Sequence, residues 1–469
     1  MGYRYIALLG DLRPRIHAFL TLYALLFVLY SAAVFIIRRQ SDSPARMLSR
    51  SDPQETKGLL VIFSFALLFR LMLLDSFPYL SDDIFRYVWD GRVWSSGINP
   101  YIHPPADPAL AALQNDTIYA QLSHKHVPTV YPPALQLLFR FLYSLNGGFL
   151  PFRMASLLFD IGTVVLLIYW LRLRRKHPGL VLLYAWNPLI IVEFAGSGHI
   201  DSVGIFFLVA FFVLLARGRM LLASFPFALA VLTKYAPVLL LPFVWRKFPK
   251  KQAARFTGAL LVAIILLFLP FIEAGPALVA GLKVYAQKWE FNASLFQLIY
   301  WPVYYLIPDS ALISAITNRG LAPDAETMRS FRVDLALLWA KGLVGILFAI
   351  IYLYVLRRDS GKGGKQPDVE LFRVWLLVFG FLAMFTTTLH PWYLAWIIPA
   401  LVFFPMNSWL LLSGLIMTSY LILPQYYFLG KWEENPKIKL LIFLPFYISY
   451  IAEVRHTNRL RAAQQPARD

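Results

Sequence analysis

The sequence predicts an all-α polytopic membrane protein. Of its 469 residues, 59% are hydrophobic and only 15% are charged, whereas soluble domains are usually about 45–50% apolar. The mean hydropathy is +0.59. The apolar stretches are too long for barrel strands and do not alternate with polar residues, which favours membrane-spanning helices. We therefore expect one integral-membrane domain over residues 1–469, with about 12–14 transmembrane helices.

The first expected helix covers residues 17–37 and ends in Arg38-Arg39. It is long enough to cross the bilayer, so we interpret it as a transmembrane helix rather than a cleavable signal peptide. The remaining helices are expected at 58–75, 134–149, 152–171, 180–197, 201–216, 220–245, 256–275, 294–307, 333–356, 371–389, 392–405, 408–428 and 438–454. The stretches at 134–149, 294–307 and 392–405 are short enough to be re-entrant or partial.

Basic residues indicate which ends of these helices face the cytoplasm. The net charge is +18, from 44 basic and 26 acidic residues. Short cytoplasmic loops collect Lys and Arg, so we expect the basic segments to be cytoplasmic and residues 76–132 to be the first extracytoplasmic loop. One basic segment, Arg172–Lys176, conflicts with this topology unless 134–149 does not cross. The basic segments that define the cytoplasmic side are 38–57, 246–255, 357–365 and the tail from Arg455.

The same composition excludes several kinds of partner and site. The positive charge is spread over short loops and forms no single patch, so we expect membrane lipids and no nucleic acid as partners. The chain has no cysteine, which excludes disulfides, thiolate metal sites and cysteine nucleophiles. Neither a Gly-rich phosphate loop nor a dinucleotide fingerprint is present. We therefore expect no nucleotide cofactor.

The loop at 76–132 is expected to hold short helices. Seven prolines divide it into pieces, and two of these pieces, Asp82–Trp94 and Pro108–Leu122, are amphipathic. Such helices could lie on the membrane surface. The side chains that would then lie at the level of the lipid headgroups are Phe85, Val88, Trp89 and Trp94.

A cluster of charged residues begins the first of these helices, in the stretch SDDIFRYVWDGR at 81–92. Ser81 is a suitable N-cap, and an acid in the first turn complements the helix dipole. Capping does not explain two acids together with Asp90, next to a membrane. A carboxylate here could act as a general base, taking the proton from an attacking hydroxyl. Our catalytic candidates are Asp82 and Asp83, and our candidates for binding a donor phosphate or sugar are Arg86, Tyr87, Asp90 and Arg92.

Paired acids could instead hold a divalent cation. We do not favour this interpretation, because Arg86 already supplies positive charge beside them, and we expect no metal site.

Further ionisable residues lie in or beside the apolar stretches, where such groups usually serve a function. His199 and Asp201 follow a glycine-rich turn, and Lys234 lies well inside 220–245. The structural alternative is that Glu193 merely forms a salt bridge with Lys234. His390, Trp392 and Tyr393 flank a proline and are typical either of an aromatic belt or of a sugar site. We add His199, Asp201, Lys234, His390, Trp392 and Tyr393 to the donor-binding candidates.

Several of these stretches occur in an order that resembles the GT-C superfamily of integral-membrane glycosyltransferases, in particular bacterial polyprenyl-phosphate-mannose-dependent mannosyltransferases. The resemblance runs from about residue 58 to 405, and the helix at 17–37 looks like an addition ahead of the shared part. The matching stretches are SDDIFRYVWDGRV (81–93), GINPY (97–101), YPP (131–133), YAWNPLIIVEFAGSGHID (184–201), LTKYAPVLLLP (232–242), WEFNASLF (289–296) and HPWYLAW (390–396).

The resemblance implies an inverting transfer of a hexose, with mannose as the favoured sugar, from a polyprenyl phosphate to an extracytoplasmic glycan or lipid. It also implies a site on the outer face of the plasma membrane, with Asp82 or Asp83 as the base and no choice between the two. Two other functions stay open. Intramembrane Lys234, Glu193 and His199 could mark the path of a transporter or flippase, and a glycan ligase or polymerase would use a larger lipid-linked donor.

Overall fold

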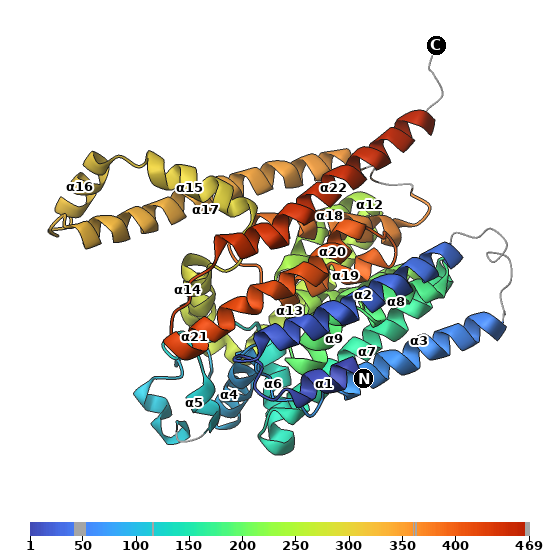
Figure 1. Ribbon diagram of the computed structural model, residues 1–469, viewed down its shortest axis with the longest axis horizontal. Coiled ribbons are helices and arrows are strands. Elements are labelled where there is room, and N and C mark those ends of the chain that lie inside the picture. Colours follow the sequence, from blue (N-terminus) through green and yellow to red (C-terminus); the bar gives the residue numbers. More distant parts are fainter. Residues whose placement is uncertain (42–52, 115–116, 360, 362–363, 465–469) are drawn as a thin grey trace, which may run out of the picture.

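The computed structural model describes residues 1–41, 53–114, 117–359, 361 and 364–464, and these residues form a helical membrane protein (Figure 1). The expected all-α fold class is confirmed. Within these ranges, the extended pairing is limited to one bridge between Phe291 and Thr388. The predicted basic segment 38–57 and the basic tail fall partly outside the described residues.

Five helical stretches are long and apolar enough to cross a membrane, or six if one bent pair counts as a single crossing. They are α2 (Ile16–Ser41), α7 (Leu150–Leu173), Lys250–Lys288, α17 (Ala325–Arg358) and Asn407–Leu429, and the bent pair is Pro178–Ala185 with Pro188–Gly196. The other expected spans form helices that are shorter, interrupted or less apolar, so the number of crossings beyond these stays a prediction.

Most of the remaining helices overlap the expected ranges, whereas the helices at Gly2–Leu8, Ala280–Lys288 and Asp309–Thr317 were not expected. In the first half they are α1 (Gly2–Leu8), α3 (Pro53–Leu71), α4 (Asp83–Ser95), η2 (Pro108–Leu113), α5 (Thr117–Gln121), α6 (Pro133–Asn146), η3 (Pro178–Val181), α8 (Leu182–Ala185), α9 (Pro188–Ile191), η4 (Val192–Gly196), α10 (Asp201–Ala216) and α11 (Met220–Val231). In the second half they are η5 (Ala236–Leu240), α12 (Leu241–Lys247), α13 (Lys250–Phe268), η6 (Leu269–Val279), α14 (Ala280–Lys288), α15 (Leu295–Leu306), α16 (Asp309–Thr317), α18 (Pro367–Phe385), η7 (Pro391–Trp396), α19 (Ile398–Leu401), α20 (Asn407–Leu415), η8 (Ile416–Ile422), α21 (Leu423–Leu429) and α22 (Pro436–Gln464).

The basic segment Arg172–Lys176 lies next to a chain segment that follows another basic loop, which favours the alternative in which 134–149 does not cross. Arg174 forms an ion pair with Asp368 at 2.5 Å, just after the segment 357–365. Helix α6, which precedes it in the chain, has 14 residues and is therefore about 21 Å long. The hydrocarbon core of a bilayer is about 30 Å thick. Helix α6 is thus shorter than this layer. We expect that it does not cross, which would place Arg172–Lys176 on the same side as the other basic segments.

Helix α4 confirms the first expected loop helix, but it does not lie on the membrane surface. Phe85, Val88 and Trp89 are buried in the protein, in an apolar cluster that includes residues of α6 and α7. The expectation was wrong because the apolar face of α6 is available as a protein partner. The second expected helix is divided into η2 and α5, and residues 115–116 between them lie outside the described ranges.

Two breaks in apolar helices bring polar groups into the body of the protein. The first lies between α8 and α9, which are bent by 57° and are followed by the π-helix η4 that carries Glu193. The second lies between α11 and η5, where Lys234 follows the last turn of α11. Because helix ends leave backbone groups unpaired, such breaks are suited to positions next to polar side chains.

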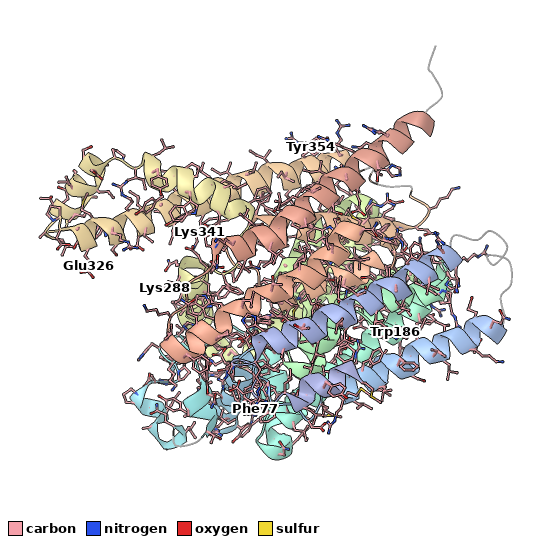
Figure 2. All side chains as sticks on the ribbon, viewed as in Figure 1. Phe77, Trp186, Lys288, Glu326, Lys341 and Tyr354 are labelled. Carbon is pink, nitrogen blue, oxygen red and sulfur yellow. The ribbon has the colours of Figure 1, made fainter. Side chains whose placement is uncertain are left out.

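Helices α15, α16 and α17 form an arm that projects from the body (Figure 1). Glu326 marks the far end of this arm, and Lys341 lies nearer to the body (Figure 2). Arg332 holds the far end together by donating to the carbonyl oxygens of Tyr304 and Ile307 and pairing with Asp309.

Candidate active site

The two catalytic candidates stand at the start of α4. Asp82 is the N-cap residue but makes no side-chain capping bond, and Asp83 is the first helical residue. The hydroxyl of Ser81, the expected cap, accepts a hydrogen bond from the Asp83 backbone N–H at 3.3 Å. Both aspartates are half-buried. Since the Asp82 side chain does not cap the helix, its carboxylate, like that of Asp83, remains available for chemistry.

His199 lies against Asp83. Its Nδ1 is 3.6 Å from Asp83 Oδ2, and its Nε2 is 3.3 Å from Glu193 Oε2. The His199 side chain is only 1% exposed. The structure thus brings Asp83 and His199 together from segments far apart in sequence, as the functional interpretation of both residues requires.

Lys234 forms its ion pair with Asp201, not with Glu193. The Lys234 Nζ lies 2.7 Å from Asp201 Oδ1, which also accepts a hydrogen bond from the Trp396 indole at 2.6 Å. The alternative partner, Glu193, instead accepts a hydrogen bond from the Tyr420 hydroxyl at 2.9 Å. The Lys234 side chain remains 29% exposed, so its ammonium group is only partly neutralised and partly enclosed.

Aromatic side chains line the same region. The Lys234 ammonium lies 3.5 Å from the centre of the Tyr393 ring, a cation–π contact. The hydroxyls of Tyr393 and Tyr285 are 2.5 Å apart. Tyr393 was a sequence candidate, whereas Tyr285 was missed because nothing in the sequence around it separates it from other interfacial tyrosines.

Trp392 is stacked between two histidines. The His199 ring lies 3.8 Å from it at an interplanar angle of 16°, and the His390 ring lies 4.3 Å from it at 13°. His390 in turn contacts Phe291. Burial, with smaller contributions from His199 and Lys234, lowers the pKa of His390. The neutral ring fits a sugar or packing contact better than a charge contact with a phosphate.

Arg86 and Asp90 form a brace inside the loop 76–132. The Arg86 Nε donates to Asp90 Oδ1 at 2.9 Å, and Asp90 Oδ2 accepts from Thr129 and Gln136. Asp90 is 1% exposed. These contacts occupy both carboxylate oxygens of Asp90, which therefore orients Arg86 and fixes α4 against the segment after it.

Tyr87 and Arg92 lie on different faces of α4 from Arg86 and Asp90. Tyr87 is buried and stacks on Phe139 at 5.0 Å. Arg92 is half-buried and donates to the Leu113 carbonyl oxygen at 3.3 Å. The donor-binding roles expected for Arg86, Tyr87, Asp90 and Arg92 stay predictions, and the contacts described here join these residues to other parts of the protein.

The surroundings of Asp83 favour a base that can exchange protons near neutral pH. Burial raises its pKa to about 6, and Asp82 and Asp201 add to the rise while His199 and Lys234 oppose it. A carboxylate with a pKa near the working pH is an effective general base.

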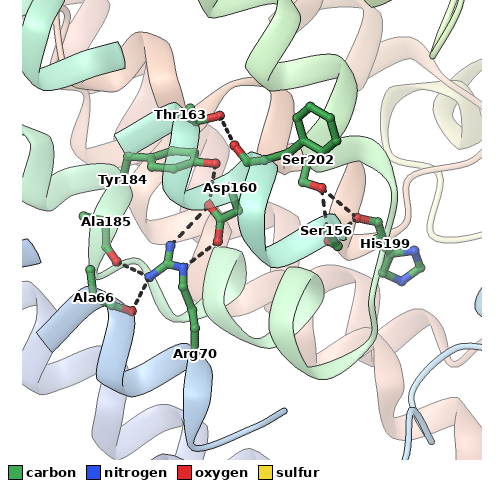
Figure 3. Close-up of polar contacts among 10 residues, drawn as sticks. Ala66, Arg70, Ser156, Asp160, Thr163, Tyr184, Ala185, His199 and Ser202 are labelled. Atoms are coloured by element: carbon green, nitrogen blue, oxygen red, sulfur yellow. Dashed lines mark hydrogen bonds and ion pairs between the residues drawn. The ribbon is translucent and has the colours of Figure 1, made fainter. Parts of the chain in front are cut away.

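Two buried networks behind the site were missed from sequence (Figure 3). Arg70 and Asp160 form an ion pair at 2.5 Å in which both side chains are fully buried, and the Tyr184 hydroxyl donates to Asp160 at 2.8 Å. The Ser156 hydroxyl donates to the His199 carbonyl oxygen at 2.8 Å. Charged residues inside the expected helices 58–75 and 152–171 were the available signal for the first network.

A third buried group, Arg153, ties the segments around the site together. Its guanidinium donates to the carbonyl oxygens of Leu73, Ser76 and Ala195. It therefore fixes the loop that leads to Asp82 against the π-helix that carries Glu193. Arg153 also lies inside an expected helix, and its charge was the signal that could have identified it.

A cavity in the described part of the chain is lined by residues outside this cluster. Among the described residues, no group of three or more His, Asp or Glu side chains is placed to hold a metal ion, and independence from cofactors stays a prediction. A cavity of about 240 Å³ lies elsewhere, between α2, α3 and η3, where Ile37, Glu55 and His177 line it.

Known proteins share the part of the chain that carries most of these residues. A family model described as "Alpha-(1->6)-mannopyranosyltransferase, N-terminal domain" matches residues 9–248. The match includes the helix expected at 17–37, so the expectation that this helix precedes the shared part was wrong. The chain is also 25% identical over 337 residues to alpha-(1->6)-mannopyranosyltransferase A of Mycobacterium tuberculosis. This alignment covers 69% of this chain and 61% of the relative. The match thus spans less than two thirds of the relative's length.

Proposed function

Because the chain belongs to the alpha-(1->6)-mannopyranosyltransferase family, we propose that it is an inverting mannosyltransferase. The donor is a polyprenyl-phosphate mannose, and the acceptor is a glycan or a lipid. The reaction takes place on the extracytoplasmic side of the plasma membrane. The observation that carries this proposal is the half-buried Asp83 carboxylate, which lies 3.6 Å from His199 and whose pKa is raised by burial and influenced by the charges of Asp201 and Lys234.

In the proposed reaction, Asp83 is the general base. As the acceptor oxygen attacks the anomeric carbon of mannose, its proton passes to the Asp83 carboxylate. The bond between that carbon and the phosphate oxygen breaks, and the polyprenyl phosphate leaves with the bonding electron pair. A single displacement inverts the anomeric carbon, so an alpha-linked product requires a beta-linked donor.

Lys234 is the proposed partner of the leaving phosphate. Its ammonium is held by Asp201 but is still 29% exposed, so it can also approach an anionic oxygen. Fixed positive charge at the position where negative charge develops lowers the barrier, and one such group can contribute about 3 kcal/mol. Tyr393, whose ring lies 3.5 Å from this ammonium, keeps Lys234 directed into the site.

The arrangement gives less support to the transporter alternative. Charged groups of a transport path would follow one another through the membrane. Here His199 and Asp201 come from one turn and Lys234 from another break, and the charges of all three act on the pKa of Asp83, which lies in a third segment. Their convergence on one carboxylate is typical of a catalytic site.

The test compares three substituted proteins with wild type in lipid, supplied with beta-linked polyprenyl-phosphate mannose and candidate acceptors. We expect Asp83→Asn to lower kcat at least ~100-fold because the base is lost. We expect Lys234→Met to lower kcat ~100-fold because the leaving phosphate loses its counter-charge. Asp82→Asn should retain activity with an altered pH dependence.

Arg4→Ala is the control for Lys234→Met, since Arg4 forms an exposed pair with Asp75. Full activity of the Asp83→Asn protein would refute the assignment of the base, and full activity of the double variant as well would exclude both aspartates. Equal turnover of the alpha-linked donor would refute inversion to an alpha-linked product.

A further inference from the structure

The His199 imidazole lies between two carboxyl groups. Its Nδ1 faces Asp83 Oδ2 at 3.6 Å, and its Nε2 faces Glu193 Oε2 at 3.3 Å. Neither ring nitrogen has a hydrogen bond of good geometry among the described residues, although both are buried. The separations are somewhat longer than hydrogen bonds, as catalytic contacts often are before substrate binds.

The backbone and ring of His199 are held in place. Its carbonyl oxygen accepts a hydrogen bond from Ser156, and its N–H donates to the Glu193 carbonyl oxygen at 3.0 Å. Trp392 stacks on the ring at 3.8 Å. Gly198 supports this position, because its φ is +76° and an added Cβ would lie 2.8 Å from Ile84, next to Asp83. The ring therefore has little freedom to turn away from either acid.

Glu193 has no exposed surface, and a second partner fixes it. Its Oε1 accepts a hydrogen bond from the Tyr420 hydroxyl at 2.9 Å, which leaves Oε2 directed at His199. A buried carboxyl group without a partner is costly. The π-helix that carries Glu193 also begins the turn that leads to His199. Glu193 and His199 thus form one local unit directed at Asp83.

We propose that His199 is a positioning residue, fixed by Glu193, that orients the Asp83 carboxylate toward the acceptor hydroxyl. This inference rests on the proposed function, in which Asp83 is the base. The Nδ1–H of His199 donates to Asp83 Oδ2. A second proton lies between His199 Nε2 and Glu193 Oε2. Asp83 Oδ1 stays free to take the proton of the acceptor. His199 keeps its own proton throughout and does not touch the donor.

This role replaces the donor-binding role expected for His199 from sequence. With a side chain 1% exposed and Trp392 on one face of the ring, His199 has no free surface for a phosphate group. Lys234, with 29% of its side chain exposed, has that surface. The two residues therefore have different roles: Lys234 contacts the donor phosphate, and His199 orients the Asp83 carboxylate.

The first arm of the test measures turnover of the full chain in lipid nanodiscs with polyprenyl-phosphate mannose. We expect His199→Ala to lower kcat about 10–100-fold, the usual effect of losing an orienting partner, with little change in KM for the donor. His199→Asn should recover most of this loss, because its side-chain N–H stands where Nδ1–H stands. Glu193→Gln keeps an oxygen for Tyr420 and should give an intermediate loss.

The second arm does not depend on turnover. A hydrophobic carbodiimide reacts with protonated carboxyl groups, and mass spectrometry gives the pH at which Asp83 is half modified. The charged groups that act on Asp83 are Asp82 on its own helix, and His199, Asp201 and Lys234 on the others. Removing His199 takes away a group that lowers the pKa of Asp83, so His199→Ala should move the modification curve to higher pH.

His103 provides matched controls, since it pairs with Asp107 in the loop 76–132 and its side chain is 31% exposed. His103→Ala and His103→Asn should match wild type in both arms. Unchanged kcat in His199→Ala, or equal losses in His199→Ala and His199→Asn with an unmoved modification curve, would overturn the positioning role. If wild type transfers no mannose, the proposed function fails, and the carbodiimide arm alone decides whether His199 acts on Asp83.

Discussion

Asp82 and Asp83 are neighbours in the chain but differ in what surrounds them. Asp83 has His199 3.6 Å away, with Lys234 and Asp201 close enough to influence its ionisation. Asp82 makes no capping bond at the helix start and acts on Asp83 mainly through its charge. At the scale of single residues, we therefore assign the base to Asp83 and a modulating role to Asp82.

The raised pKa of Asp83 predicts the pH dependence of transfer. Its pKa is about 6, so the base is protonated and inactive below that pH, and kcat/KM should rise as the pH passes through 6. Asp82→Asn removes a charge that raises this pKa and should shift the rise to lower pH. The measurement is a pH profile between 4.5 and 8, and a profile that is flat across pH 6 would contradict the assignment.

The same shift has the opposite effect on stability. A carboxyl group with a raised pKa in the folded state stabilises the fold most below its ordinary value, and this contribution disappears as the pH rises through about 6. Asp83→Asn should therefore be more stable than wild type above pH 6, although it is less active. Thermal unfolding at pH 5 and pH 8 distinguishes this result from a general loss of structure.

The Arg70–Asp160 pair predicts a large effect on stability. Both side chains are fully buried, so Arg70→Ala leaves an uncompensated charge and should cost about 3–5 kcal/mol of unfolding free energy. Replacing both partners by Met and Leu should recover most of this loss. Titration with denaturing detergent measures the change. Arg4→Ala breaks an exposed pair and should leave the midpoint unchanged.

The ionisable residues of the site were easier to predict from the sequence than the residues with which they pair. Lys234 and His199 stood out because charges inside apolar stretches are rare. The sequence alternative paired Lys234 with Glu193, but the structure pairs it with Asp201 at 2.7 Å. Pairing depends on where helices break and how the pieces turn, which the hydropathy of residues 220–245 does not encode.

At the scale of elements, the close packing of α4 on α6 sets the position of the acids. Gly91 makes this packing possible, because an added Cβ would lie 2.5 Å from the Phe139 carbonyl oxygen. The amphipathic pattern of α4 was recognised from sequence, but its partner was not, since the pattern is the same for a lipid surface and for a protein surface. Residues such as Phe85 and Trp89 were therefore placed at the wrong interface.

This packing predicts a result for Gly91→Ala. The methyl group must push α4 away from α6, so we expect a loss of about 1–3 kcal/mol in unfolding free energy and a marked drop in kcat as Asp83 moves. The matched control is Gly258→Ala in α13, where nothing lies within 4 Å of the added Cβ. That control should be neutral or slightly stabilising. Normal activity of Gly91→Ala would show that the position of α4 is not critical.

At the scale of the whole molecule, the basic segments and the candidate acids lie at opposite ends of the same helices. Helix α3 runs from the basic region to the loop before Asp82, and α7 returns from beside that loop to Arg172–Lys176. The positive-inside rule therefore predicts which side each end faces. The count of crossings was harder to predict, because apolar stretches such as 134–149 form helices shorter than the hydrocarbon layer.

The absence of native cysteine makes this topology directly testable. Single cysteines at Glu326 and Arg358, two exposed residues at opposite ends of α17, should react differently with a membrane-impermeant maleimide in intact cells. We expect labelling at position 326 and protection at position 358 until the membrane is permeabilised. The reverse pattern would place Asp83 in the cytoplasm and would remove the extracytoplasmic site from the proposal.

The projecting arm has a consequence for the choice of lipid. Helix α17 has 34 residues and is about 51 Å long, while the hydrocarbon layer is about 30 Å thick. Tyr352 anchors it by donating to the Leu239 carbonyl oxygen at 2.8 Å, but its far half contacts mainly α15 and α16. The far half must tilt or stand in water, to an extent set by acyl-chain length. Reconstitution in short-chain and long-chain phospholipids should therefore change the angle of the arm while leaving the helices around Asp83 as they are.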